Sequence, residues 1–385
     1  MDPIYLDHNA TTPIHPEIEE VMARAHRDGY ANPASQHQPG QQARRMLDGA
    51  REQIAALLGA ELSGPQADRL IFTSGGTEAN NLALIGIARA RSPEQPGHLV
   101  VSAIEHASMI EPAEWLMEHG WRLDCLGVTA DGVIRADLLA ERITPQTAAV
   151  SMMLANHDTG VLQPVAQMAV VCREKGVPLV SDAVQAVGKI PVHFRQLGLA
   201  AMSIGAHKFR GPVGIGALLL RHDVALEPLL HGGAQQGRLR PGTESVALAM
   251  GMAKALELSR ARHETECQRI TALRGRFESG LQAGIPGVLI NGAAAPRLPN
   301  TANVAFPGID GQILLLALDM AGVACSVGSA CSSGSTELSP TLRAMGLANE
   351  RVASSLRFSL GATTTDAEID EALRRIINVC RDLAG

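Results

Sequence analysis

The feature that most constrains the fold is an alternation of short apolar runs with helical patterns between about residues 70 and 220. Most of the runs are separated by segments with helical spacing, at 77–91, 108–119, 136–142 and 164–175. This alternation predicts an α/β domain in which helices cover a mostly parallel sheet. Ligands of such sheets bind beyond the carboxyl ends of the strands. The runs that we interpret as strands are RLIFTS (69–74), HLVVSA (98–103), RLDCLGV (122–128), AAVSMML (148–154), VPLVSDA (177–183) and GIGALLL (214–220).

The pattern changes in the last third of the chain. Residues 242–270 predict one long helix, and the remainder predicts a smaller α+β domain that ends in a helix over 366–383. We place the boundary near residue 257. This gives a large domain of residues 15–257 and a small domain formed by residues 1–14 and 258–385. A chain of 385 residues is long enough for two such cores.

Charge and cysteine content exclude several classes of protein. The net charge is −6, which gives no reason to expect a surface for nucleic acid or anionic membranes. The strongest apolar run, 313–318, is too short to span a bilayer, and the acidic first ten residues lack the pattern of a secretory signal. Six scattered cysteines without a CxxC pair favour a reducing compartment. We therefore expect a cytoplasmic protein with no metal site.

A candidate phosphate site follows the first strand, in TSGGTEANN (73–81). Its glycines allow close approach of the backbone, and Thr77 adds a hydroxyl to the free N–H groups where a helix begins. The same residues also fit a glycine-containing turn with an ordinary cap, so this motif alone leaves both interpretations open.

Three further candidates follow later strands. Asp182 ends a strand and is either a helix cap or the partner of a pyridine-type ring nitrogen. Lys208 lies in the nearly uncharged stretch SIGAHKFRGPVGIG (203–216), where desolvation would make its amine nucleophilic, although most lysines are simply solvated. His106, in IEHAS (104–108), is by itself most simply a capping or packed histidine.

Cys331 lies in GSACSSGS (328–335), among glycines and serines that offer it little to pack against. This composition predicts a mobile, solvent-exposed loop. The alternative is a surface cysteine without a role. Cys325 lies beside apolar residues, and we expect it to be packed rather than paired with Cys331 in a disulfide or a metal site.

Taken together, these motifs resemble those of a cysteine desulfurase of the class V, fold-type I aminotransferase family that uses pyridoxal phosphate. The similarity is strongest to the nitrogen-fixation and iron–sulfur-assembly branch, and it covers nearly the whole chain. HKFRGP and GSAC are its most specific motifs. The others are YLDHNATTP (5–13), NPASQHQPGQQA (32–43), GTES (242–245) and SSLRFSLG (354–361).

The resemblance implies a seven-stranded, mostly parallel sheet in the large domain, a smaller α+β domain, and a homodimer. It implies that Lys208 carries pyridoxal phosphate covalently, that His106 stacks on the pyridine ring, and that Cys331 receives the sulfur of L-cysteine as a persulfide for a sulfur-acceptor protein. It assigns the remaining site residues as follows: Asp182 to the ring nitrogen, Gln185 to the phenolic oxygen, Gly76, Thr77, His207 and the second subunit's Thr243 to the phosphate, and Arg357, Asn156 and His157 to the substrate.

The chain departs from the family pattern at several positions. Relatives usually carry Asn-Asn-Glu where this chain has Asn156, His157 and Asp158, and we expect the charge of the histidine to vary near neutral pH. Gly205 stands where many relatives have a serine or threonine that contacts the phosphate. Residues 338–340, LSP here, are often Glu-Pro-Ser, and Ala362 falls where an arginine is common.

Two other functions remain open at this stage. One is a selenocysteine lyase, or another class V lyase or aminotransferase. The thiol of Cys331 argues for sulfur transfer, since transamination needs no such group. The other is a binding or regulatory protein that has lost the chemistry. The presence of Lys208, Asp182, His106 and Cys331 counts against it.

Overall fold

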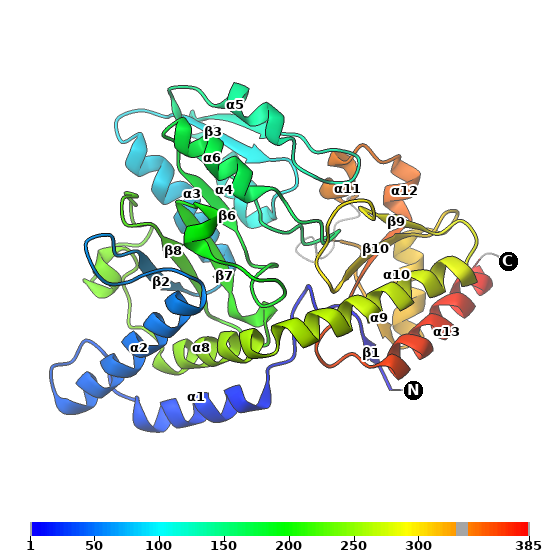
Figure 1. The fold of residues 1–385 in the computed structure, drawn as a ribbon, viewed down its shortest axis with the longest axis horizontal. Coiled ribbons are helices and arrows are strands. Elements are labelled where there is room, and N and C mark those ends of the chain that lie inside the picture. Colours follow the sequence, from blue (N-terminus) through cyan, green and yellow to red (C-terminus); the bar gives the residue numbers. More distant parts are fainter. Residues whose placement is uncertain (1, 329–337, 384–385) are drawn as a thin grey trace.

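The computed structural model describes residues 2–328 and 338–383. These residues form two larger sheets that lie next to each other, each with its own helices, and a short two-stranded sheet (Figure 1). The larger sheet has seven strands in the order β2-β8-β7-β6-β5-β3-β4. The mostly parallel sheet predicted from the sequence is confirmed, because only β8 runs antiparallel to its neighbours. The strands are β2 (Arg69–Thr73), β3 (His98–Ser102), β4 (Arg122–Leu126), β5 (Thr147–Ser151), β6 (Leu179–Asp182), β7 (Ala201–Gly205) and β8 (Gly216–Leu220).

Strand β7 was not predicted, although it lies in the middle of the sheet and every residue in it is buried. Its sequence, AMSIG, ends with a glycine and contains few of the branched side chains that mark strands. Its pairing with β6 and β8 places the segment that follows it, with Lys208, at the carboxyl edge of the sheet.

Helices cover both faces of the large sheet. One face packs against α3 (Gly76–Arg91) and α4 (Ala107–Glu118). The opposite face packs against α2 (Gln38–Leu57), α6 (Val165–Glu174) and α8 (Val246–Ala261). Except in the edge strand β4, both strand faces are therefore buried, which explains why these strands are apolar runs without alternation. The remaining helical segments of this part are α1 (Pro16–Asp28), η1 (Ala136–Leu138), α5 (Leu139–Arg142), α7 (Phe194–Leu197), η2 (Ala206–Lys208) and η3 (Gln235–Arg238).

The single long helix predicted over 242–270 is wrong. The chain forms two helices there, α8 and α9 (His263–Gly284), because Arg262 between them has non-helical backbone angles of φ −107° and ψ 3°. Helix α8 packs on α1 and α2, whereas α9 packs on the last helix, α13 (Asp366–Leu383), which has the predicted bounds.

The smaller sheet is antiparallel, in the order β12-β10-β9, and has its own apolar core with α9, α10 and α13. The N-terminal strand β1 (Ile4–Tyr5) pairs with β11 and joins this core. We propose that the two cores belong to two domains divided between α8 and α9. The other elements are β9 (Leu289–Asn291), β10 (Thr301–Ala305), α10 (Gly311–Met320), β11 (Val323–Ala324), α11 (Pro340–Ala344), α12 (Asn349–Ala353) and β12 (Ser355–Ser359).

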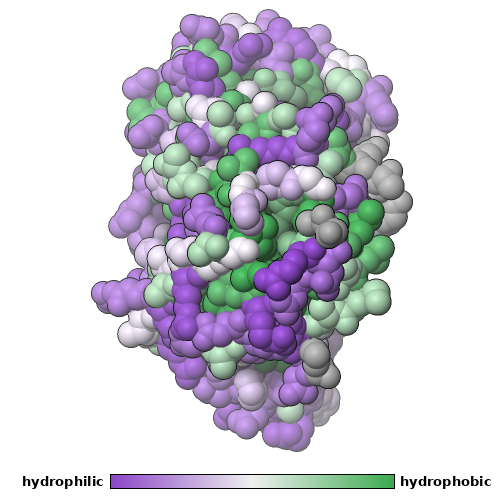
Figure 2. Space-filling view, turned by 90° about the vertical axis from the view of Figure 1, so that its right-hand side faces the viewer, coloured by the Kyte–Doolittle hydropathy of each residue, from purple (hydrophilic) through white to green (hydrophobic). Residues whose placement is uncertain are grey.

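The side of the molecule formed by the smaller sheet has apolar surface near its centre, bordered by hydrophilic residues (Figure 2). Helix α10 contributes exposed apolar side chains in this part of the molecule, at Ile313, Leu316 and Met320. Within residues 2–328 and 338–383, no helix is both long enough and apolar enough to cross a membrane.

Candidate active site

A cleft of about 240 Å³ lies at the carboxyl edge of the large sheet, between it and the smaller sheet. Residues from near the two ends of the chain meet there with residues from the carboxyl ends of five strands, β2, β3, β5, β6 and β7. No local sequence pattern shows this convergence. Most of the predicted site residues line this one cleft: Gly76, Thr77, His106, His157, Asp182, Gln185, His207, Lys208 and Arg357.

The amino end of α3 forms one end of the cleft. This helix begins at Gly76, and its N-cap, Gly75, provides no side-chain hydrogen bond. The free N–H groups of a helix of 16 residues, together with the Thr77 hydroxyl, therefore favour an anion there. A Cβ on Gly76 would come within 2.7 Å of Val184, so only glycine fits this position without a shift.

His207 lies beside this helix end as a neutral ring. Burial, together with the charges of Lys208 and Lys189, lowers the pKa of His207 to about 4. Its Nδ1 is 3.2 Å from the hydroxyl of Thr11. At neutral pH this imidazole can hold an anion through a hydrogen bond but adds no charge.

Asp182 ends β6 with its carboxylate at the bottom of the cleft. Asn80 donates from Nδ2 to its Oδ2 at 2.7 Å, and the backbone N–H of Val184 donates to its Oδ1 at 2.9 Å. These two donors fix the position of the carboxylate. The residue is only 7% exposed, so the carboxylate lies in a largely water-free position.

Lys208 reaches the cleft from the segment directly after β7. Its Nζ donates to the backbone oxygens of Asn9 at 2.5 Å and Ala10 at 2.8 Å. A second lysine, Lys189, donates from Nζ to Asn9 Oδ1 at 2.9 Å and to Gln185 Oε1 at 2.5 Å. The N-terminal segment therefore holds the amine of Lys208 in the cleft. Through Asn9 and Lys189, the same segment is also linked to Gln185.

His106 and His157 stand edge to face, with ring centroids 5.3 Å apart. His106 caps α4, since its Nδ1 accepts from the N–H of Ser108 at 3.1 Å. Burial lowers the pKa of His157 well below its ordinary value, and the neighbouring His106, Arg357 and Lys208 lower it further. The expectation that His157 changes charge near neutral pH is therefore wrong, because this buried ring is already neutral there.

Glu105, next to His106 in sequence, is a buried carboxyl group behind the cleft. Its Oε1 accepts from Ser102 and from the N–H of Met153, whereas Oε2 has no partner among the described residues. Burial raises the pKa of Glu105 to about 7.

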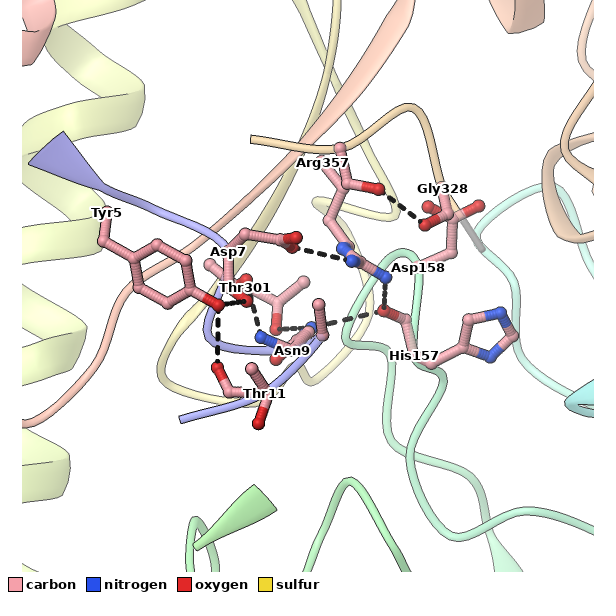
Figure 3. A network of polar contacts seen from close by, with 12 residues as sticks. Tyr5, Asp7, Asn9, Thr11, His157, Asp158, Thr301, Gly328 and Arg357 are labelled. Carbon is pink, nitrogen blue, oxygen red and sulfur yellow. Dashed lines mark hydrogen bonds and ion pairs between the residues drawn. The ribbon is translucent and has the colours of Figure 1, made fainter. Parts of the chain in front are cut away.

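Arg357 lies on β12 and faces the cleft from the smaller sheet (Figure 3). Its Nη2 pairs with Asp7 at 2.8 Å, and its Nη1 donates to the backbone oxygen of His157 at 3.2 Å. Asn9 donates to that same oxygen at 3.2 Å, and so the N-terminal segment, β12 and the loop after β5 are linked (Figure 3). The Nε of Arg357 is buried and has no partner among the described residues.

Three predicted site residues are not among those that line the cleft. The assignment of Asn156 to the substrate is wrong. Its side chain is buried, its oxygen accepts from the N–H groups of Asp158 and Thr159, and its Nδ2 donates to the backbone oxygen of Ile104. The amide therefore shapes the loop instead of facing a ligand. Thr243 is exposed. Cys331 lies outside the described residues.

Cys325 packs against the core of the smaller sheet, as expected, and burial raises the pKa of its thiol. None of the five described cysteines forms a disulfide with another.

Sequence reasoning missed Asp7, Asn9 and Lys189, although YLDHNATTP contains the first two. Their contacts join positions up to 350 residues apart, so only the folded chain shows them.

Three features together define a fold-type I pyridoxal-phosphate enzyme: the mostly parallel sheet, the lysine directly after a central strand, and the second sheet that closes the cleft. The family model of the class-V aminotransferases matches residues 4–372. The chain is 44% identical to an IscS-like cysteine desulfurase of Mycobacterium tuberculosis, over 96% of this chain and 94% of that protein. It is 39% identical to the cysteine desulfurase IscS of Dictyoglomus turgidum, over 99% and 96%.

A solved structure described as a NifS-like protein superposes with a TM-score of 0.91, at 31% identity, covering 99% of this chain and 100% of that one. The chain belongs to the class-V aminotransferase family and, within it, to the cysteine desulfurases.

The cleft fits the cofactor of this family, pyridoxal phosphate. The uncapped end of α3 suits a phosphate, the fixed Asp182 carboxylate suits a protonated ring nitrogen, and Lys208 supplies an amine. Two buried polar atoms of the cleft residues, Nδ1 of His157 and Nε of Arg357, have no partner among the described residues. Because such groups are costly when left unpaired, they indicate that the cleft is completed by a polar ligand.

Proposed function

We propose that the protein is a pyridoxal phosphate-dependent L-cysteine desulfurase that produces L-alanine and carries the sulfur as a persulfide on Cys331. The observation that carries this proposal is the convergence of Lys208, Asp182, His106 and Arg357, from four separate elements, on one cleft. Pyridoxal phosphate, when bound, withdraws electrons from the carbon atoms next to the substrate's amino group and so weakens its carbon–sulfur bond.

Arg357 is proposed to bind the carboxylate of the substrate. Asp7 takes one edge of its guanidinium at 2.8 Å, which leaves the buried Nε as a donor without a partner among the described residues. A substrate carboxylate beside Nε would satisfy this donor and use the planar geometry that only arginine offers. The neutral His157 ring would add one hydrogen bond without adding charge.

Cys331 is proposed to take the sulfur. The carbon–sulfur bond of cysteine breaks, a sulfur–sulfur bond forms on Cys331, and the carbon takes up a proton in place of sulfur. Cysteine and the thiol thus give alanine and a persulfide, with no further oxidant or reductant. The thiolate is the reactive form of such a group, and buried Cys325, with its raised pKa, is a poor substitute.

We further propose a cytoplasmic homodimer that passes the persulfide to an acceptor protein. Thr243 supports the dimer, because it is exposed and does not line the cleft of its own chain, where the family pattern expects it to contact a neighbour's phosphate. The unpaired described cysteines support a reducing compartment. An iron–sulfur scaffold is the first acceptor to test, given the branch that the motifs resemble.

Two measurements test this function. Purified Lys208→Ala should remain folded but lose the visible absorbance of the covalently bound cofactor; an unchanged spectrum would contradict the assignment of Lys208.

The wild-type protein should release alanine from L-cysteine, and a comparison with selenocysteine separates a desulfurase from a selenocysteine lyase. Turnover of selenocysteine alone would contradict the proposed substrate.

A further inference from the structure

A second cavity, of about 160 Å³, lies on the other side of Lys208, where α8 and α9 meet the N-terminal segment. Of the residues that line it, only Lys208 also lines the active-site cleft. Its walls are largely apolar, with Ile18, Phe209, Leu258 and Ile270 among them. An apolar cavity of about 150 Å³ is large enough to hold benzene, so this one can hold a small organic molecule.

Two arginines line the cavity without a carboxylate partner among the described residues. Among these residues, the side chain of Arg210 makes one hydrogen bond, from Nε to the backbone oxygen of Pro13, at 3.4 Å, and no ion pair forms between Arg262 and another described residue. Glu266 is the carboxylate in the lining, and it pairs with Arg269 at 3.2 Å. Both arginines line the same cavity. Burial lowers the pKa of Arg210 and the charge of Arg262 lowers it further, against a smaller opposing effect of Glu266.

Positive charge near the cavity also lowers the pKa values of two histidines that line it, His8 and His15. Burial, followed by the charges of Lys189 and Arg210, lowers the pKa of His8 to about 4. The pKa of His15 is lowered mainly by burial and then by Arg210; Glu17 partly opposes this, and Arg262 lowers the pKa by a smaller amount. Both rings are therefore neutral near pH 7. His8 is only 3% exposed, and its Nδ1 has no hydrogen-bond partner among the described residues.

The backbone of Arg210 is held in a conformation that few non-glycine residues adopt, with φ of +66°. Its N–H donates to the Thr12 hydroxyl at 2.8 Å, and its oxygen accepts from the N–H of His15 at 3.0 Å. Such strained residues persist where the surrounding structure fixes them, and they cluster at ligand sites. The N-terminal segment thus fixes the position of this arginine at the cavity.

Ala362 also lines the cavity. Its short side chain, next to Gly361, leaves space that a long side chain would occupy. We propose that this cavity is a second binding site, separate from the active site, for a small organic anion: a carboxylate held by Arg210 and Arg262, with an apolar body against the walls of α8 and α9.

Benzoate is a suitable probe, because it combines a benzene ring with one carboxylate. Isothermal titration calorimetry of the cofactor-loaded protein, in a buffer without other organic anions, should show one benzoate site per chain. Benzamide has the same shape without the charge and should bind at least about tenfold more weakly, since the charged hydrogen bonds are lost. Equal binding of the two compounds, or no benzoate binding at millimolar concentration, would contradict the proposal.

Variants separate this site from the carboxylate site at Arg357. Arg262→Gln, at an exposed position that should fold normally, should weaken benzoate binding about tenfold or more. Ala362→Leu should fill the cavity and abolish the binding. Arg260→Gln is the matched control, because Arg260 lies on α8 but lines a different pocket; it should bind benzoate as the wild type does. Benzoate binding that is unchanged in both Arg262→Gln and Ala362→Leu would place the anion elsewhere and overturn the proposal.

Discussion

The hydroxyl of Ser339 donates to the carboxylate of Asp158, with 2.5 Å between Oγ and Oδ2. The same serine caps α11, and Asn303 donates to the other carboxylate oxygen at 2.9 Å. Gly328 also lies against this carboxylate: a Cβ there would be 3.3 Å from Oδ2. The single buried carboxylate therefore contacts both described ends of the segment that contains Cys331. The contact between Asp158 and Ser339 joins the loop after β5 to the start of α11.

A double-mutant cycle at this pair tests whether the two residues are energetically coupled. Asp158→Ala and Ser339→Ala should each destabilise the protein, and their combined effect should be smaller than the sum by ~1–2 kcal/mol, because the charged hydrogen bond is removed only once. Urea unfolding of the four proteins measures the coupling. Additive effects would show that the two residues act independently.

His157→Asn tests the charge state of the buried ring. The pKa of His157 is lowered well below its ordinary value of 6.5, so the wild-type ring stays neutral between about pH 6 and 8. We expect the two proteins to show the same pH dependence of kcat/KM for cysteine over this range, with a lower KM in the variant because asparagine restores the amide donor. A flatter profile in the variant would mean that His157 titrates after all.

Gly205→Ser tests the missing phosphate contact. A Cβ on Gly205 would lie 3.6 Å from the backbone N of Gly76 and 3.5 Å from Val184, which are ordinary contacts, so a serine fits. Its hydroxyl should slow the loss of cofactor during dialysis about tenfold. The matched control is Gly49→Ser, at an exposed position of α2 with no atom within 4 Å. Equal rates of cofactor loss in all three proteins would place the phosphate away from Gly205.

Glu105 should make the folded protein less stable as the pH rises. Its pKa is raised from 4.5 to about 7. Between these values the folded state keeps a proton that the unfolded state releases, so stability is lost with increasing pH, by ~3 kcal/mol in total. Glu105→Gln cannot titrate and should lose fewer degrees of Tm than the wild type between pH 5 and 8. A parallel decrease in both proteins would show that Glu105 is already charged at pH 5.

The large sheet, and the position of the ligand site at the carboxyl ends of its strands, could be predicted because most of these strands are buried on both faces and therefore form apolar runs in the sequence. Strand β7 was missed because small and polar residues interrupt that signal, and the break at Arg262 was missed because the helical pattern continues across it. The links from Asn9 to His157, Lys189 and Lys208 depend on pairings between distant segments. The role of Asn156 was assigned wrongly because the sequence shows an amide but not where it points.

The central claim is that Cys331 receives the sulfur, and it is tested by counting the alanine formed per cofactor. Cys331→Ser leaves Lys208, Asp182 and Arg357 unchanged, so it should still bind cysteine but form no alanine, because a hydroxyl is a far weaker nucleophile toward sulfur than a thiolate. Cys325→Ser, the matched control, should keep most of its turnover, since its thiol packs in the core. Mass spectrometry of the wild type should find the persulfide on the peptide with Cys331. Full alanine production by Cys331→Ser, or a persulfide on Cys325, would contradict the account.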